Sequence, residues 1–191
     1  IKEIIFIISN KKKLIKKYFN NDLFYRHIIK KKKDKRIKSE YKKILKLKKM
    51  IKYVYQNKPK GTGDAVLKTK KLITGTHFLI LFPDDLIMKR NCSKDMISIH
   101  NKHNCSVMAS IKVKKNNVSR WGIYSVSKKL SKNNFIINDV VEKPSINKAP
   151  STNAVIGRYI LPKEIFKKLE KQKKGVGGEI HITDAIRKLI N

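Results

Sequence analysis

The chain has 191 residues, of which 40% are hydrophobic, so it can build one domain around a hydrophobic core and is not disordered by composition. Its formal net charge is +33, yet only six of the 47 basic residues are arginine. Base-reading proteins rely on bidentate arginine, and Lys, Ile and Asn are enriched together here, so we attribute the charge to AT-rich codon usage rather than to nucleic-acid binding.

The first part of the chain predicts two buried strands joined by helices. Residues 4–8 form a continuous β-branched and aromatic run, which is typical of a buried strand. Apolar residues then recur at helical spacing, and residues 20–50 predict one or two amphipathic helices broken near the lysines at residues 30–35. Residues 51–56 predict the second strand, with Gln56 at its carboxyl end.

Two glycines, Gly61 and Gly63, follow the second strand. Glycine lets the backbone approach a flat or charged ligand closely. The helix expected over residues 64–73 would direct its N-terminus at this loop, which favours a phosphate or the polar edge of a base. The alternative is that the two glycines only form a turn.

Two carboxylates, Asp84 and Asp85, follow the third predicted strand at residues 78–82. Ligands of open α/β sheets bind outside the carboxyl ends of strands. Carboxylate and phosphate oxygens are the ligands that Mg²⁺ prefers. The alternative is that the two side chains only turn the chain or cap the next helix.

The rest of the chain alternates strands with helices, which predicts an α/β domain. Gly122 follows an aromatic residue, which suggests close backbone approach to a ligand. Glu142 and Lys143 end a strand, and by themselves such pairs are ordinary surface pairs. Residues 175–178 predict a flexible loop. Further strands are predicted over residues 105–113, 118–124, 135–141 and 153–161, and helices over residues 96–103, 164–171 and 182–191.

The two cysteines, Cys92 and Cys105, do not form a disulfide framework and are expected as reduced thiols. His100, His103 and Cys105 lie close in sequence, but no fourth ligand has the spacing of a metal site. No apolar run approaches the ~18 residues that span a bilayer, and no signal peptide is visible. We therefore expect a cytoplasmic protein without a membrane partner.

Six motifs occur in a fixed order: QxxPxGxGxA (56–65), LFPDD (81–85), VSRWGI (118–123), VEKP (141–144), APSxxAVIGRYIL (149–161) and GGEIxITDAI (177–186). Together they resemble the motifs of the bacterial UTP–glucose-1-phosphate uridylyltransferases. The resemblance covers nearly the whole chain and is weakest over residues 20–50. It implies a Rossmann-like nucleotidyltransferase fold with a mixed, mainly parallel central sheet flanked by helices. It also implies conversion of UTP and glucose 1-phosphate to UDP-glucose and pyrophosphate.

The resemblance also assigns roles on the nucleotide and metal side. Gln56 and Gly61 would contact the uracil, and Gly63 would shape the same loop. Asp84 would ligate Mg²⁺, and Lys143 would bind the phosphates, so these two residues would carry the catalysis. Lysine suits that task because it is a compact, flexible point charge.

Three residues are assigned to the sugar by the same resemblance. Gly122 would offer its backbone to a sugar hydroxyl. Glu142 would accept hydrogen bonds from glucose hydroxyls, and Asp85 would lie beside the sugar, although this position is not always acidic in the family.

Several features depart from the family. Asp64 stands where many members have His, and Thr152 where many have Asn. The family's glycine-rich nucleotide loop, with its strand and its catalytic arginine and lysine, would lie before Ile1, and its second metal-binding Asp beyond Asn191. We therefore expect residues 1–191 to be one nucleotidyltransferase domain truncated at both ends and inactive alone.

Two alternatives stay open at this point. One is a basic nucleic-acid-binding protein, which predicts steeply salt-dependent binding and lysines gathered on one face. The other is a nucleotidyltransferase that uses another sugar phosphate or dTTP. The resemblance further implies that the complete protein is a homo-oligomer, either a dimer or a tetramer.

Overall fold

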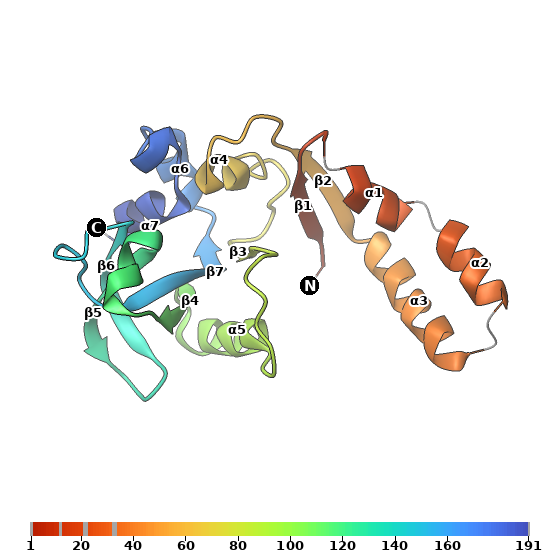
Figure 1. Ribbon diagram of the computed structural model, residues 1–191, viewed down its shortest axis with the longest axis horizontal. Helices are drawn as coiled ribbons and strands as arrows, with labels where there is room; N and C mark the ends of the chain where they lie inside the picture. Colours follow the sequence, from red (N-terminus) through yellow and green to blue (C-terminus); the bar gives the residue numbers. More distant parts are fainter. Residues whose placement is uncertain (1, 12, 21–22, 32–33, 191) are drawn as a thin grey trace. The chain divides into compact units, whose positions relative to one another are not determined.

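The computed structural model describes residues 2–11, 13–20, 23–31 and 34–190 (Figure 1). The chain divides into two compact units. The N-terminal unit is Ile1–Pro59 and the C-terminal unit is Lys60–Asn191. Among the described residues, no helix has the length and apolar character that crossing a bilayer would require.

The N-terminal unit contains one parallel strand pair. β1 (Ile4–Ile8) and β2 (Ile51–Tyr55) lie side by side with Ile4 opposite Ile51. A parallel pair needs a long crossover connection, which three helices supply here. The predicted helix break at the lysine cluster is confirmed, because Asp34 caps the third helix by accepting a hydrogen bond from the Arg36 N–H at 2.7 Å. The helices are α1 (Lys13–Asn20), α2 (Leu23–Lys31) and α3 (Lys35–Lys48).

The C-terminal unit contains a five-stranded sheet in which β7 pairs with β3, β4 and β5, and β5 pairs with β6. All of these pairings are antiparallel, so the prediction of a mainly parallel sheet is not borne out among the described residues. The reason is connectivity: a short turn joins β5 to β6, whereas parallel neighbours need helical crossovers. The strands are β3 (His77–Leu81), β4 (Val107–Lys112), β5 (Gly122–Lys129), β6 (Phe135–Glu142) and β7 (Asn153–Pro162).

The secondary structure of the C-terminal unit differs from the sequence prediction in several places, one of which is the helix predicted over residues 96–103, which begins at Cys92. The predicted helix over residues 64–73 ends at Leu67, the strand predicted from Val118 begins only at Gly122, and residues 175–178 include a short 3-10 helix. Val118 instead lies fully buried in a 3-10 helix. The helices are α4 (Thr62–Leu67), α5 (Cys92–His103), η1 (Lys115–Arg120), α6 (Ile165–Glu170), η2 (Val176–Gly178) and α7 (Ile182–Ile190).

The hydrophobic core of the C-terminal unit lies between the sheet and the helices α4, α6 and α7 (Figure 1). Tyr124, Leu161 and Phe166 are at most 1% exposed. The rings of Phe78 and Phe166 stack with their centroids 5.2 Å apart, which joins β3 to α6. The core therefore fixes the strand ends on which most of the predicted site residues lie.

Candidate active site

The glycine loop at the start of α4 packs against residues 180–182 of the same chain. Gly61 has φ 104°, a conformation that favours glycine, and a Cβ there would lie 2.5 Å from the Ile180 carbonyl oxygen. The Gly63 N–H donates to that oxygen at 2.7 Å. The Ile182 N–H donates to the Thr62 hydroxyl at 3.1 Å. The predicted close backbone approach therefore exists, and its structural partner is the chain's own backbone.

Glu142, the last residue of β6, faces Gly122, the first residue of β5. The carboxylate is held from two sides: Oε2 accepts a hydrogen bond from the Thr183 hydroxyl, and Oε1 lies 3.7 Å from His181 Nδ1. A Cβ at Gly122 would approach Oε2 to 3.1 Å and Thr183 Cγ2 to 2.8 Å. The Glu142 side chain is 12% exposed and Gly122 is buried, so the carboxylate is an oriented acceptor packed against the first residue of β5.

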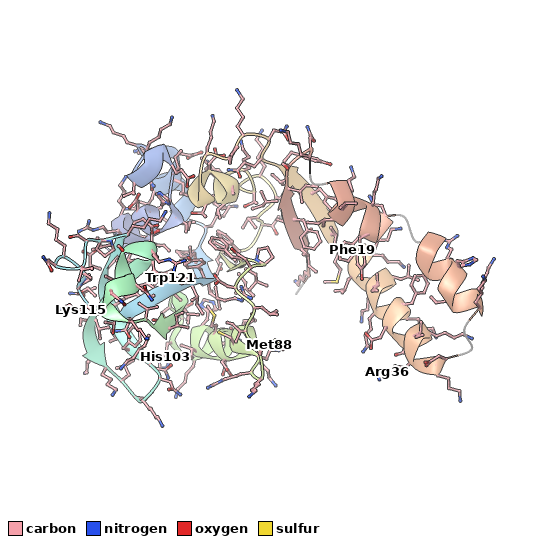
Figure 2. The ribbon with its side chains drawn as sticks, viewed as in Figure 1. Phe19, Arg36, Met88, His103, Lys115 and Trp121 are labelled. Carbon is pink, nitrogen blue, oxygen red and sulfur yellow. The ribbon has the colours of Figure 1, made fainter. Side chains whose placement is uncertain are left out.

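Lys143 follows Glu142 in a left-handed backbone conformation, with φ 45°. Its N–H donates to the carbonyl oxygen of Trp121, a residue labelled in Figure 2, at 3.0 Å. This conformation costs a non-glycine residue about 1–2 kcal/mol, and such strain is found at functional sites. The side chain is exposed, and no carboxylate among the described residues pairs with it, so its charge is available to an anion.

Asp84 and Asp85 follow β3 and differ in what their side chains contact. Asp85 Oδ2 accepts a hydrogen bond from the Gly157 N–H at 2.6 Å. Asp84 is exposed, and within the described residues no hydrogen bond or ion pair engages its carboxylate. The geometry thus gives Asp85 a partner inside the fold and leaves Asp84 free for a ligand, while the predicted sugar contact of Asp85 stays a prediction.

The residues fit a magnesium ion in one particular way. No group of three or more His, Cys, Asp or Glu side chains in the described part of the chain could hold a metal. Mg²⁺ is commonly bound by one or two carboxylates together with substrate phosphates and water. The free Asp84 carboxylate suits that arrangement and not a cage made of protein alone.

Most of the predicted site residues are joined by short contacts. Gly61 and Gly63 contact Ile180, and three residues further on Thr183 contacts both Glu142 and Gly122. A Cβ at Gly122 would also lie 3.1 Å from Val155 of β7, the strand that binds Asp85 through Gly157.

The pKa of Tyr159, a residue of β7, is affected by two of the predicted site residues, Glu142 and Asp85. Burial raises the pKa of Tyr159, and the negative charges of Glu142 and Asp85 raise it further. Two carboxylates that are far apart in sequence therefore both disfavour ionisation of one buried phenol.

Gln56 belongs to the N-terminal unit, where its N–H donates to the Ile8 carbonyl oxygen at 2.9 Å. This bond continues the β1–β2 ladder by one residue. The predicted uracil contact of Gln56 stays a prediction.

Sequence reasoning missed the roles of Thr183 and His181. The sequence analysis gave Thr183 no role beyond its place in a motif, but its hydroxyl binds Glu142. His181 is 5% exposed, and its Nε2 contacts the Val176 carbonyl oxygen at 2.7 Å. Thr183 is a specified residue of the GGEIxITDAI motif, whereas His181 stands at its unspecified position, so the motif gave a signal for Thr183 alone.

The histidine and cysteine cluster near residue 103 has a structural arrangement. His100 Nδ1 contacts the Cys105 carbonyl oxygen at 2.7 Å, and its ring lies 4.5 Å from that of His77. Cys92 and Cys105 are both free thiols, as predicted. The cluster therefore caps the end of α5 and is not a metal centre among the described residues.

The sequence profile of the family described as "Nucleotidyl transferase" matches residues 4–191. The chain belongs to this family. A Methanocaldococcus jannaschii protein, named provisionally as a UTP–glucose-1-phosphate uridylyltransferase, is 35% identical over 193 residues, which cover 100% of this chain and 66% of the relative. A Streptococcus pyogenes UTP–glucose-1-phosphate uridylyltransferase is 37% identical over 139 residues, 70% of this chain and 46% of the relative.

Solved structures of UDP-glucose pyrophosphorylases resemble the chain along nearly its whole length. A UDP-glucose pyrophosphorylase complexed with UDP-glucose has a TM-score of 0.80 at 32% identity, covering 97% of this chain and 69% of that one. The UTP-bound enzyme of Acinetobacter baumannii has a TM-score of 0.75 at 27% identity, covering 99% and 66%. These matches confirm the predicted α/β nucleotidyltransferase fold. The chain spans less than two thirds of the length of the sequence relatives named above.

Proposed function

We propose that this chain is the part of a UTP–glucose-1-phosphate uridylyltransferase that holds the sugar, the phosphates and the metal. The observation that carries the proposal is the Glu142 carboxylate, which Thr183 and His181 orient beside the backbone of Gly122. The names of the relatives, and the UDP-glucose and UTP in the titles of the solved structures, support the choice of substrates.

In the proposed reaction, a phosphate oxygen of glucose 1-phosphate forms a bond to the α-phosphorus of UTP. The bond from that phosphorus to the bridging oxygen breaks, and pyrophosphate leaves with the electron pair. The negative charge on the phosphate oxygens must be stabilised by fixed positive charge, as phosphoryl chemistry generally requires. The unpaired ammonium group of Lys143, exposed at the end of β6, supplies it.

The sugar would be held by residues on two neighbouring strands. Glu142 accepts hydrogen bonds from glucose hydroxyls, and the Gly122 backbone contacts a further hydroxyl. Any side chain at Gly122 would meet Thr183 and Glu142, so glycine at this position allows both residues to pack against the backbone of β5.

The metal and the base complete the proposal. Asp84 would hold Mg²⁺, which when bound neutralises charge on the UTP phosphates. Gly61 and Gly63 would shape the loop that contacts the uracil, and Gln56 is proposed for the same base. We also propose that the complete protein is a homo-oligomer, which sedimentation would measure.

Ligand binding to the 191-residue chain tests the proposal. UDP-glucose, UDP, dTDP-glucose and a DNA oligonucleotide are titrated into the chain by calorimetry at two salt concentrations. We expect saturable UDP-glucose binding that Glu142→Gln weakens. Asp139→Asn is the matched control, because Asp139 is also on β6 but pairs with the surface residue Arg187.

Two results would contradict the proposal. One is UDP-glucose affinity that Glu142→Gln leaves unchanged. The other is steeply salt-dependent DNA binding without UDP-glucose binding, which would favour the nucleic-acid alternative. A separate turnover assay tests the expectation that the 191 residues alone do not form UDP-glucose at a normal rate.

A further inference from the structure

The turn that carries Asp84 is attached to β7 at both of its ends. At the first end, the Phe82 N–H donates to the Gly157 carbonyl oxygen at 2.8 Å. At the second end, the Asp85 carboxylate accepts from the Gly157 N–H at 2.6 Å. One residue of β7 thus binds both ends of the turn through its backbone.

Arg158, the next residue of β7, binds the same two ends with its side chain. Its NH1 group donates to the Phe82 carbonyl oxygen at 2.7 Å and to the Gly157 carbonyl oxygen at 2.9 Å. Its NH2 group donates to the Asp85 carbonyl oxygen at 2.5 Å. The guanidinium therefore spans the turn and leaves only Pro83 and Asp84 between the two attachment points.

The Arg158 contacts are made to carbonyl oxygens and not to carboxylates. Among the described residues, no carboxylate forms an ion pair with this guanidinium. The rigid fork of arginine can reach two separate acceptors at once, which the single ammonium group of lysine cannot do in the same geometry. This points to a role in fixing backbone geometry rather than in pairing charge.

Close packing restricts the same region further. A Cβ at Gly157 would lie 2.3 Å from the Phe82 Cβ, so the Phe82 side chain covers this glycine directly. The Phe82 ring also packs edge-on against Tyr159 with the centroids 5.7 Å apart. The attachment of the turn to β7 therefore combines hydrogen bonds with a close packing contact.

We propose that Arg158 is a positioning residue, which together with the Asp85 carboxylate holds the turn at residues 82–85 so that the Asp84 carboxylate is presented to a divalent cation. The inference rests on the proposed function for the role of Asp84. It assigns Asp85 and the arginine of the GRYIL motif to one structural task. Partners that orient a metal ligand typically contribute about 10–100-fold to metal affinity.

The test uses Mn²⁺ as a paramagnetic substitute for Mg²⁺ and the isotope-labelled 191-residue chain. Mn²⁺ should broaden the amide signals of residues 83–86, and Asp84→Asn should abolish this broadening. We expect Arg158→Met to require about tenfold more Mn²⁺ for the same broadening, with partial rescue by Arg158→Lys. Arg187→Met is the matched control, since Arg187 is an exposed arginine paired with Asp139.

Amide hydrogen exchange gives a readout that needs neither metal nor turnover. The Asp85 N–H donates to the Phe82 carbonyl oxygen at 3.3 Å, and the Leu86 N–H to the Asp84 carbonyl oxygen at 3.2 Å. Arg158→Met should accelerate exchange at these two amides and leave the β5–β6 amides unchanged. A general loss of protection would instead indicate a merely structural role and would contradict the proposal.

The other outcomes also decide the question. Unchanged Mn²⁺ affinity and exchange in folded Arg158→Met would overturn the inference. If that variant does not fold, Asp85→Ala takes its place, because it removes the acceptor of the Gly157 N–H, and unchanged Mn²⁺ affinity in folded Asp85→Ala overturns the inference. Mn²⁺ broadening that survives Asp84→Asn would refute the metal role and this inference, whereas metal-free UDP-glucose binding tests the sugar site separately.

Discussion

Two turns at the ends of strands hold the charged residues of the candidate site, and they are built in different ways. In the turn after β3, Asp85 is bound to β7 through its own carboxylate, and its neighbour Asp84 is exposed and unpaired among the described residues. In the turn after β6, Glu142 is bound by Thr183, and its neighbour Lys143 is exposed in a strained conformation.

The two turns share one design: a held charged residue beside a free one. They differ in how the free residue is placed. Asp84 is placed by side-chain bonds from β7, whereas Lys143 is placed by its own left-handed backbone and its N–H bond to Trp121. Mutations should therefore disturb the first turn through its partners and the second through the residue itself.

The largest effect is expected from Lys143→Gly. Removal of the ammonium group should weaken both UDP-glucose and UDP by about 10–100-fold, since a hydrogen bond to a charged group contributes about 1.5–3 kcal/mol. The same change should raise the free energy of unfolding by about 1 kcal/mol, because glycine adopts a φ of 45° without strain. Calorimetry and thermal unfolding measure the two effects. Lower stability in this variant would contradict the proposed strain.

The second largest effect should distinguish the carboxylate of Glu142 from that of Asp85. Glu142→Gln should weaken UDP-glucose about tenfold (~1.4 kcal/mol) relative to UDP, because only the sugar contact is lost. Asp85→Asn should leave this ratio unchanged, because its carboxylate binds Gly157. Titration of both ligands into both variants measures the ratio. A shifted ratio in Asp85→Asn would support the predicted sugar contact of Asp85 instead.

A smaller effect should appear at alkaline pH through Tyr159. Burial and the charges of Glu142 and Asp85 raise its pKa above the ordinary 10.0, so the phenol stays neutral in the folded chain when the unfolded chain ionises. The free energy of unfolding should therefore fall as pH rises above about 10, with about 1 kcal/mol lost to Tyr159 at pH 11. Tyr159→Phe should remove this share in urea unfolding measured from pH 8 to 11. If the free energy of unfolding depended on pH identically in the unmodified chain and in Tyr159→Phe, the predicted contribution of Tyr159 would be refuted.

The smallest effect is expected from an ion pair near the first turn that takes no part in holding it. Arg90 and Asp95 pair at 2.5 Å, but their side chains are 67% and 43% exposed. Exposed pairs contribute little, so Asp95→Asn should change the free energy of unfolding by less than about 0.5 kcal/mol and leave ligand binding unchanged. A larger decrease in the free energy of urea unfolding would show that the Arg90–Asp95 pair also stabilises the turn, in addition to the bonds from β7.

Apolar runs in the sequence predicted the positions of the strands correctly. They did not predict whether neighbouring strands are parallel or antiparallel. Residues 4–8 and 153–161 carry continuous apolar runs, and both form strands where expected. The direction of a strand depends on its partner, and β7 pairs with three strands that are distant in sequence. Val118 was misassigned because an apolar residue in a short 3-10 helix looks the same as one in a strand.

The candidate site shows the same limit. The order of the motifs identified Gly122, Glu142 and Lys143 as candidate site residues. The structure places Gly122 and Glu142 opposite one another on neighbouring strands. The roles of Thr183 and Arg158 depend on contacts that span 41 and 73 or more residues, which spacing along the sequence cannot reveal. The pair at Asp84 and Asp85 also looked alike in sequence, and only the Gly157 contact separates them.

The bond between the Thr62 hydroxyl and the Ile182 N–H joins residues 120 positions apart. Contacts of such long range form slowly because a large loop must close first. During synthesis the glycine loop must wait for the 180–183 segment to leave the ribosome before it acquires its partner. The glycine loop therefore acquires its final partner late in folding, after the segment at residues 180–183 has docked against it.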